Sequence, residues 1–230
     1  MEKYNRKPLK DFGQILSFQN YEKVAESNKW ESKSKLVFSK KITESNDYCI
    51  VAQNVTDAHI CYIDSLDNDF IYYLHLLLDS VFGRLIVCDN TVSNGKINGL
   101  TSIKTLKEFP VAVVPSDIQN AASKLDQTIR YILEIFKEEE DIQFIESARS
   151  FMFELRDDFV LEIYANELFE ANGIDIVNSF VSIIKDSEDT DLKALAPKIL
   201  DSVTNPDSAL LSNMRRFRVL IGNIVHNLEQ

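Results

Sequence analysis

The spacing of apolar residues changes along the chain, and the change predicts two kinds of structure. Before Pro115, short apolar runs rich in β-branched and aromatic residues alternate with clusters of Asn, Asp and Ser. After Pro115, apolar residues recur every three or four positions, as on one face of an α-helix. We therefore expect an α+β protein. A mixed α/β N-terminal domain with a small sheet would cover residues 1–115, and an all-helical domain with a long connecting helix would cover residues 116–230.

In the first half, the clearest signals are short strands. β-branched and aromatic residues bounded by Asn and Asp predict strands at residues 36–38, 48–52 and 59–63. The segment around Phe12 and Ile15 is interpreted as a short helix or a docking segment.

An amphipathic helix with an acidic first turn is predicted from Phe70 to about Gly83. A further strand is expected at residues 85–88. Pro110 and Pro115 flank an apolar segment, which predicts an edge strand or an extended segment.

The apolar spacing predicts five helices in the second half of the chain. Ser116 is a good N-cap for the first, and the acidic run at residues 138–141 ends or bends it. The second helix starts near Phe144 and stops at Asn172-Gly173, a pair that favours the left-handed conformation. The remaining helices are expected at residues 174–184, 192–203 with an internal Pro197, and 208–228.

Composition agrees with a folded protein of long regular elements. Hydrophobic residues make up 45% and charged residues 27% of the 230 residues, with only 6 Gly and 5 Pro. The start of the chain is polar and lacks the apolar region of a secretory signal. Three cysteines without CxxC spacing fit a reducing compartment. We expect a cytoplasmic protein that does not enter the membrane.

The net charge of −11 is unevenly spread. Residues 1–41 carry 10 Lys+Arg and 5 Asp+Glu, residues 42–115 carry 4 and 9, and residues 116–230 carry 11 and 22. An acidic body repels a phosphate backbone, so any nucleic-acid contact should use the basic N-terminal segment. We favour the simpler interpretation that Lys3, Arg6, Lys7 and Lys10 form a solvated tail.

No catalytic or cofactor motif is present. The chain lacks GxxxxGK[ST], GxGxxG, GxSxG and HExxH, so we expect a non-enzyme with no cofactor and no metal. The pair His59 and Cys61 is too small for a zinc site. His75, on the apolar face of its helix, is interpreted as a core histidine, and His226 as a cation at a helix C-terminus.

Two clusters of charged residues each allow two interpretations. Glu154, Asp157, Asp158 and Glu162 form either a solvated acidic face or a hard-cation site, and we favour the former. The arginines at positions 215, 216 and 218 either pair with nearby carboxylates or contact a phosphate or a partner, and local pairing is favoured.

A family resemblance adds to this picture. From Phe70 the chain reads FIYYLHLLLDSVFGRLIV, followed by a Gly-containing turn and then GLTSIKTLKEFPVAVVPSDIQNAASKLDQTIRYIL. This order resembles the closing part of a target-recognition domain in specificity subunits of type I restriction–modification systems. There, a YLYYLLNS-like helix precedes a Gly-rich turn, an approach segment, an extended exit and a long helix. The matching positions are Ile103, Leu106, Phe109, Pro110, residues 111–115, Ile118, Gln119, Ala122, Leu125 and Asp126. Val113-Val114 and Asp117-Ile118 depart from that pattern.

A second stretch, LRDDFVLEIYANELFEANGIDIV at residues 155–177, is similar to a segment near the C-terminus of adenine-specific DNA methyltransferases with a fused specificity region. Together the two stretches cover about half the chain. No Asn-Pro-Pro-Tyr-like motif is present, since Asn205-Pro206-Asp207 stops short of it, and no S-adenosylmethionine loop is visible.

The resemblance implies a non-catalytic DNA-recognition module. It would bind double-stranded DNA and work beside a methyltransferase or nuclease domain or subunit. Lysines would neutralise phosphates, and a loop Asn would read adenine. The expected DNA-binding residues are Lys33, Lys35, Lys40, Lys41, Asn94 and Lys96. The alternative is a protein-interaction adaptor that acts through the acidic helical half without binding DNA. A third hypothesis, an enzyme of unrecognised type, would require a deep pocket with converging polar groups.

Overall fold

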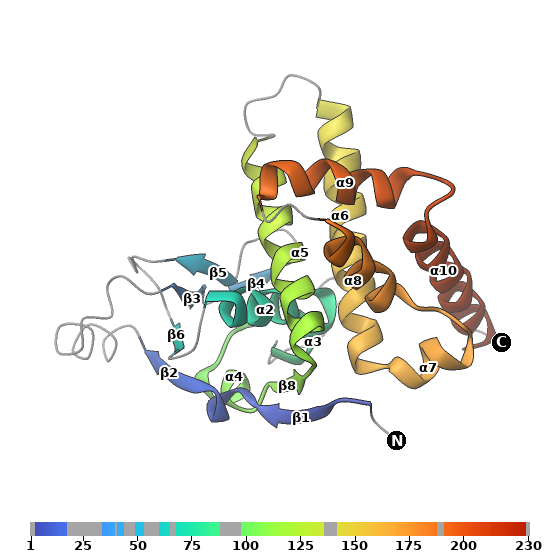
Figure 1. Cartoon of the computed structure of the whole chain (residues 1–230). Helices are drawn as coiled ribbons and strands as arrows, with labels where there is room; N and C mark the ends of the chain where they lie inside the picture. The colour runs from blue at the N-terminus through green and yellow to red at the C-terminus, as the bar shows by residue number, and fades with distance from the viewer. Residues whose placement is uncertain are drawn as a thin grey trace. The chain divides into compact units, whose positions relative to one another are not determined.

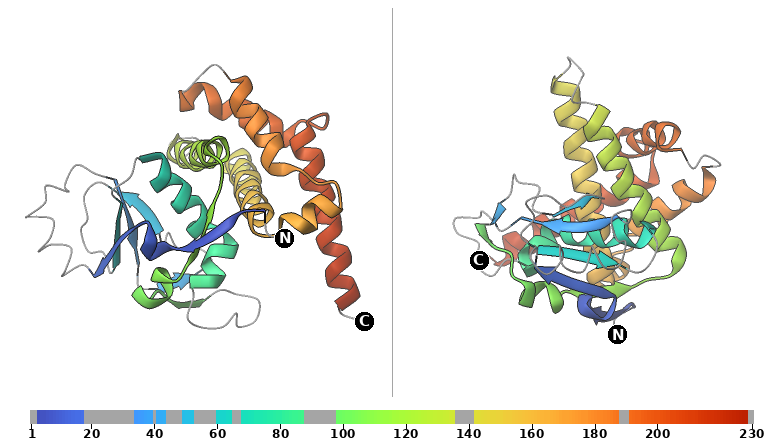
Figure 2. Two further views of the ribbon diagram at one scale, coloured as in Figure 1. Left: turned by 60° about the horizontal axis from the view of Figure 1, so that its bottom comes forward. Right: turned by 90° about the vertical axis from the view of Figure 1, so that its left-hand side faces the viewer.

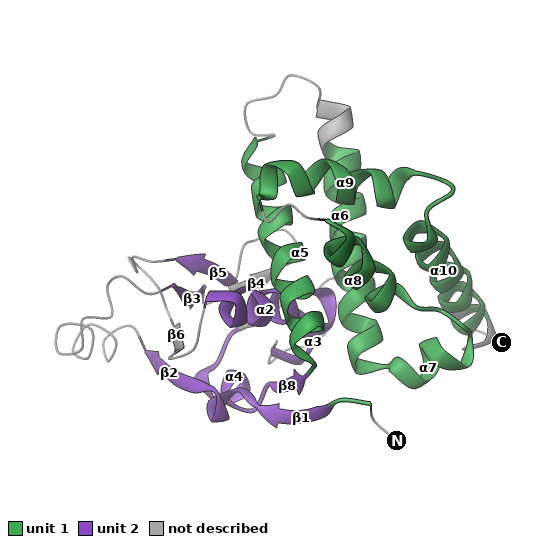
Figure 3. Ribbon diagram, viewed as in Figure 1, with its two compact units in different colours: residues 1–4, 114–230 green, residues 5–113 purple. Residues whose placement is uncertain are grey.

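The computed structural model describes residues 3–17, 34–39, 41–43, 49–52, 60–64, 68–87, 98–135, 142–187 and 191–228 (Figure 1). The chain divides into two compact units (Figure 3), a mixed unit of residues 5–113 and a helical unit of residues 1–4 and 114–230. The sequence analysis placed this division between residues 115 and 116. Strands mixed with helices precede an entirely helical region, so the predicted α+β class is confirmed.

The described strands of the mixed unit form one larger sheet and two separate pairs. The larger sheet has the order β2-β6-β3-β5 and is antiparallel, while β1 pairs with β8 and β4 with β7. β3 is an inner strand, and Leu36 lies opposite Tyr62 on one side and Val51 on the other. The bounds are β1 Asn5–Pro8, β2 Gly13–Ser17, β3 Lys35–Phe38, β4 Lys41–Thr43, β5 Cys49–Ala52, β6 Ile60–Asp64, β7 Asn98–Leu100 and β8 Pro110–Val113.

The strands predicted at residues 36–38, 48–52 and 59–63 correspond to β3, β5 and β6. Of the two alternatives predicted for the segment around Ile15, a short helix or a docking segment, the helix is wrong. The segment is strand β2, in which Ile15 is buried and pairs with Tyr62 of β6. The alternation of exposed Gln14, buried Ile15 and half-buried Leu16 is too short to identify a strand without its neighbour.

Helix α2 (Asn68–Asp79) lies against the sheet, contacting β3 and β5. Its buried residues include Phe70, Leu74 and Leu77. His75 is also buried, and its Nε2 lies 2.9 Å from the carbonyl oxygen of Cys49 in β5, so the predicted core histidine is confirmed. The other helical elements of this unit are η1 (Leu9–Asp11), α3 (Val81–Val87) and α4 (Ile103–Lys107).

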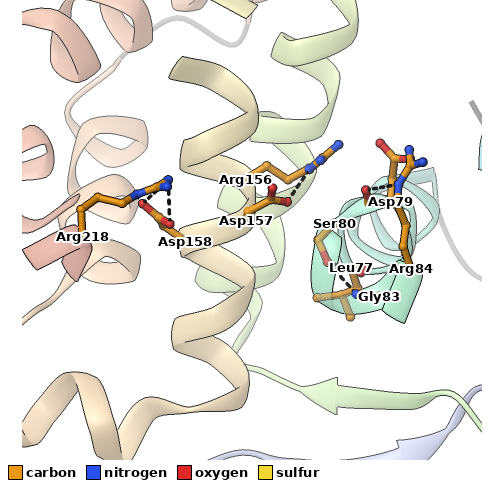
Figure 4. A network of polar contacts seen from close by, with 9 residues as sticks. All are labelled: Leu77, Asp79, Ser80, Gly83, Arg84, Arg156, Asp157, Asp158 and Arg218. Carbon is orange, nitrogen blue, oxygen red and sulfur yellow. Dashed lines mark hydrogen bonds and ion pairs between the residues drawn. The ribbon is translucent and has the colours of Figure 1, made fainter. Parts of the chain in front are cut away.

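Residues 85–88 were predicted to form a strand and Gly83 to end the preceding helix. Both predictions are wrong, because α2 ends at Asp79 and α3 follows after a bend of 77°. Ser80 makes the bend: its hydroxyl donates to the carbonyl of Leu77 and accepts from the backbone N–H of Gly83 (Figure 4). Gly83 allows a close approach, since a Cβ there would lie 2.6 Å from the carbonyl oxygen of Leu78.

The helical unit contains six helices in its described part. α5 contacts α6, α8 and α9, and α10 contacts α6, α8 and α9 (Figure 1). Aromatic pairs hold the core together: Phe159 and Phe180 meet edge to face at 5.8 Å, and Phe169 stacks on Phe217 at 4.5 Å. The bounds are α5 Ser116–Ile135, α6 Ile142–Tyr164, α7 Asn166–Ala171, α8 Ile176–Asp186, α9 Leu192–Thr204 and α10 Ala209–Leu228.

Helix termini account for the differences from the predicted boundaries. Ser116 was expected to cap α5 but is its first residue, because the carbonyl of Pro115 accepts the first helical hydrogen bond from Gln119. The predicted second helix is interrupted at Ala165 and becomes α6 and α7. The acidic run at residues 138–141 lies outside the described residues.

The predicted stop at Asn172-Gly173 is confirmed. Gly173 has φ 61°, its N–H donates to Glu170, and the N–H of Ile174 donates to Phe169, a Schellman arrangement that ends α7.

Among the described residues, each helix taken singly is too short or too polar to cross a bilayer. The bent pair α2 and α3 together reaches the required length and apolar composition.

Candidate functional site

The structure places the predicted DNA-binding residues unevenly. Lys33, Lys40, Asn94 and Lys96 lie outside the described residues. Lys41 begins β4, whose pairing with β7 sets Thr43 opposite Asn98, which follows Lys96 by two positions in the sequence. In the same pair of strands, Lys41 lies opposite Leu100.

Lys35 does not fit its predicted role. It lies in the inner strand β3 and its exposed fraction is 0%, so its ammonium group does not reach a phosphate backbone at the surface. A Lys flanked by Ser and Leu in sequence gives no sign of burial, which comes from the strands on both sides.

Described basic residues of the mixed unit instead gather on β1, η1 and α4. η1 contacts α4, the backbone N–H of Leu9 donates to Phe109, and Lys10 pairs with Glu108 across the same contact at 2.7 Å. The basic side chains of these elements, which we call the basic surface, are Arg6, Lys7, Lys10, Lys104 and Lys107. Lys7, Lys104 and Lys107 are exposed. The sequence analysis noted the lysines of β1 and η1 but missed those of α4, since only the fold brings residues 104–107 beside residue 10.

A second candidate site lies on the helical unit, beside α10. A groove of about 400 Å³ runs between α10 and the turn that joins α7 to α8. We call it the α10 groove, and it is lined by Asn172, Ile174, Arg215, Arg216, Val219, Leu220 and Asn223.

The arginines of α10 have different partners. Arg218 pairs with Asp158 and Glu154 of α6, as predicted. Arg216 donates to the carbonyl of Asn172 at 2.8 Å. A cation at this position pairs with a carbonyl oxygen at the C-terminus of α7 and interacts favourably with the helix dipole. Arg215 is exposed and makes no hydrogen bond or ion pair with any residue that the structure describes. Among the described contacts, the predicted pairing with carboxylates is therefore found for Arg218, whereas Arg216 binds a backbone carbonyl and Arg215 is left for another contact.

The carboxylates of α6 were expected to form a solvated acidic face, and for Asp158 and Glu162 this is wrong. Asp158 is 2% exposed, because the helices around α6 cover this side of it. Its carboxylate accepts from Arg218 (Figure 4). Burial raises the pKa of Asp158 to about 7, although the Arg218 guanidinium opposes the change.

Glu162 has a structural role at the start of α8. Its Oε2 accepts from the backbone N–H groups of Ile176 and Val177, at 2.7 and 3.0 Å. These bonds favour the ionised form, but burial outweighs them and raises the pKa of Glu162 to about 7. Asp175 caps the same helix by accepting from Asn178. The arrangement is explained by helix capping, without any ligand.

No cluster of three or more potential metal ligands occurs in the part of the chain that the structure describes. No family model, curated protein or solved structure matches the chain.

Proposed function

We propose that the chain is a non-catalytic DNA-recognition module, and that its mixed unit contacts the phosphate backbone of double-stranded DNA. The supporting observation is the division of charge between the units. Residues 5–113 contain 13 Lys+Arg and 13 Asp+Glu, whereas residues 1–4 and 114–230 contain 12 and 23. All of the net negative charge therefore belongs to the helical unit, and the mixed unit does not repel DNA by its net charge.

The basic surface supplies the contacts in this proposal. Lys7, Lys104 and Lys107 are exposed, and such lysines bind phosphates as point charges. The predicted contacts at Lys33, Lys40, Lys41, Asn94 and Lys96 stay part of the proposal, with base reading assigned to Asn94. Lys35 is left out because it is buried.

The order of elements after residue 68 also supports the proposal. Helices α2 and α3 are followed by β7, the short α4, the extended β8 and the 20-residue helix α5. The described elements match the helix, the approach, the extended exit and the long helix that the resemblance to restriction–modification specificity domains implies, while residues 88–97, where its turn is expected, lie outside the described residues. The helical unit would then dock a methyltransferase or nuclease partner.

A protein-interaction adaptor without DNA binding is the second candidate. The α10 groove favours it, because it is open and combines apolar lining with an arginine that has no partner among the described residues.

The two candidates are separated by fluorescence anisotropy of the full chain with a labelled mixed-sequence duplex, titrated with salt. DNA recognition predicts binding at micromolar or tighter affinity at low salt, lost steeply as salt rises. It also predicts that Arg215→Glu, in the α10 groove, leaves the DNA affinity unchanged. If the chain does not bind DNA even at low salt, DNA recognition by this chain is wrong and the adaptor remains.

A further inference from the structure

The two halves of α10 differ in how they pack. In its first half, Leu210, Met214 and Phe217 are each at most 3% exposed. Past Phe217 the helix loses this cover: Val219 is 65% and Ile221 37% exposed, and Leu220 is half-buried. In the left view of Figure 2, the last turns of α10, near the C-terminus, extend past the other helices of the unit. An apolar helix end is therefore left open beside the groove.

The charge of α10 is opposite to that of the unit that carries it. Residues 208–228 contain three Arg and one His but no Asp or Glu, whereas the helical unit as a whole has 12 Lys+Arg and 23 Asp+Glu. The residues that line the α10 groove likewise include no carboxylate. The groove is a local cationic and apolar surface on an acidic unit.

The walls of the groove are fixed in place. Arg216 holds the turn after α7 through the carbonyl of Asn172. Asn213 joins α10 to α8, since its amide accepts from the N–H of Asp175 and donates to the hydroxyl of Ser179 at 3.1 Å. A partner would meet a preformed surface and would not have to order it, which favours binding.

We propose that the α10 groove binds an acidic amphipathic helix of a partner protein. Its apolar face would lie on Val219 and Leu220, and a carboxylate at its edge would pair with Arg215. Charge complementarity selects an acidic partner, and the apolar lining selects one with an apolar face. A nucleic-acid backbone fits less well, because sugar and phosphate would cover these apolar side chains without an apolar contact in return. The inference does not depend on DNA binding by the mixed unit.

The test uses the full chain and a fluorescein-labelled helical peptide of about 16 residues, long enough to form a helix on binding. Leucines every three or four positions form its apolar face, and glutamates flank them. A second peptide has lysine in place of every glutamate. The protein variants are Arg215→Glu and Val219→Asp, both at exposed positions that leave the core intact, and the control is Lys193→Glu on an exposed position of α9. Circular dichroism and thermal melting check that every variant folds.

The proposal predicts a Kd on the order of 10 µM for the glutamate peptide. Arg215→Glu and Val219→Asp should each weaken binding about tenfold or more, Lys193→Glu should change it less than about twofold, and the lysine peptide should not bind.

Four results would overturn it. The first is absence of binding, or equal binding by Arg215→Glu and Lys193→Glu. The second is displacement of the peptide by inorganic phosphate beyond that by sodium chloride of equal ionic strength, which indicates a small-anion site. The third is displacement by duplex DNA, which indicates a nucleic-acid surface. The fourth is a dimer in light scattering that Val219→Asp dissociates, which assigns the groove to a second copy of this chain.

Discussion

One guanidinium nitrogen of Arg218 donates to both carboxylate oxygens of Asp158, at 3.1 and 3.3 Å. The two groups are buried to very different extents, since the Arg218 side chain is 49% exposed and that of Asp158 only 2%. The arginine keeps part of its hydration while the carboxylate loses nearly all of its own. The pair therefore offsets only part of the cost of burying the ionised Asp158, and this imbalance explains why the pKa rises to about 7 despite the ion pair.

The raised pKa of Asp158 predicts that the protein becomes less stable as the pH rises from about 4 to about 7. With a pKa of about 7, the folded state keeps a proton that the unfolded state, near 3.9, has already released. The native state thus binds more protons in this window, so the free energy of unfolding falls as pH rises. Asp158→Asn should reduce that fall by on the order of 1–3 kcal/mol between about pH 4 and 7. Urea denaturation across this range measures it. A variant with the wild-type pH profile would contradict the prediction, and Asp201→Asn at an exposed position of α9 is the control.

Glu162→Ala should destabilise the helical unit by on the order of 2 kcal/mol. The substitution leaves the buried N–H groups of Ile176 and Val177 without their acceptor, and such groups are costly to leave unpaired. Glu162→Gln retains a side-chain oxygen and should cost less than half as much. Urea denaturation at pH 7 compares the two variants. Equal losses would show that an amide oxygen cannot replace the carboxylate as the acceptor, which would contradict the prediction for Glu162→Gln.

Gly83→Ala should destabilise the mixed unit by more than about 2 kcal/mol, because the new Cβ would meet the carbonyls of Leu77 and Leu78. Gly222 in α10 is the matched control, since a Cβ there has no atom within 4 Å. Gly222→Ala should stabilise the protein by about 0.5–1 kcal/mol through helix propensity. Thermal unfolding of both variants distinguishes a steric effect from propensity, and a neutral Gly83→Ala would contradict the close approach.

The sequence predicts the elements that depend on local apolar periodicity. It does not predict those that depend on contacts with residues distant in the sequence. The helices after Pro115 and the stop at Gly173 follow from apolar spacing and the conformational freedom of glycine. β2 was missed because its partner, β6, lies more than 40 residues away in sequence. α3 was taken for a strand because four consecutive apolar or small residues fit either structure.

At the candidate sites, too, the exposure of a side chain depends on contacts that the local sequence does not reveal. Lys35 and Lys104 are both lysines beside apolar residues, yet one is buried in an inner strand and the other is exposed on a short helix. Asp158 and Glu162 also look like surface acids in sequence. Their burial depends on how α8 and α10 cover α6, which periodicity does not reveal.

Tyr73→Phe should cost about 1 kcal/mol of stability. The buried phenol of Tyr73 donates to the carbonyl of Ala112 at 2.6 Å and so ties α2 to β8 within the mixed unit. The neighbouring Tyr72 is half-buried, and Tyr72→Phe serves as the control with an expected change within about 0.5 kcal/mol. Equal effects in urea denaturation would show that the bond to Ala112 contributes nothing.

The proposed DNA contact makes a quantitative prediction about salt. If Lys104 and Lys107 each neutralise one phosphate, then replacing both by glutamine removes two counterion-release events. The slope of log K against log salt should become shallower by about 0.9 for each lysine. Because such contacts are independent of sequence, the affinity for every duplex should fall to a similar extent. Lys193→Gln on the helical unit should leave the slope unchanged. Anisotropy titrations at several salt concentrations measure all three proteins. An unchanged slope in the double variant would remove α4 from the interface, and the segments around Lys41 and Asn94 would then have to supply the phosphate contacts.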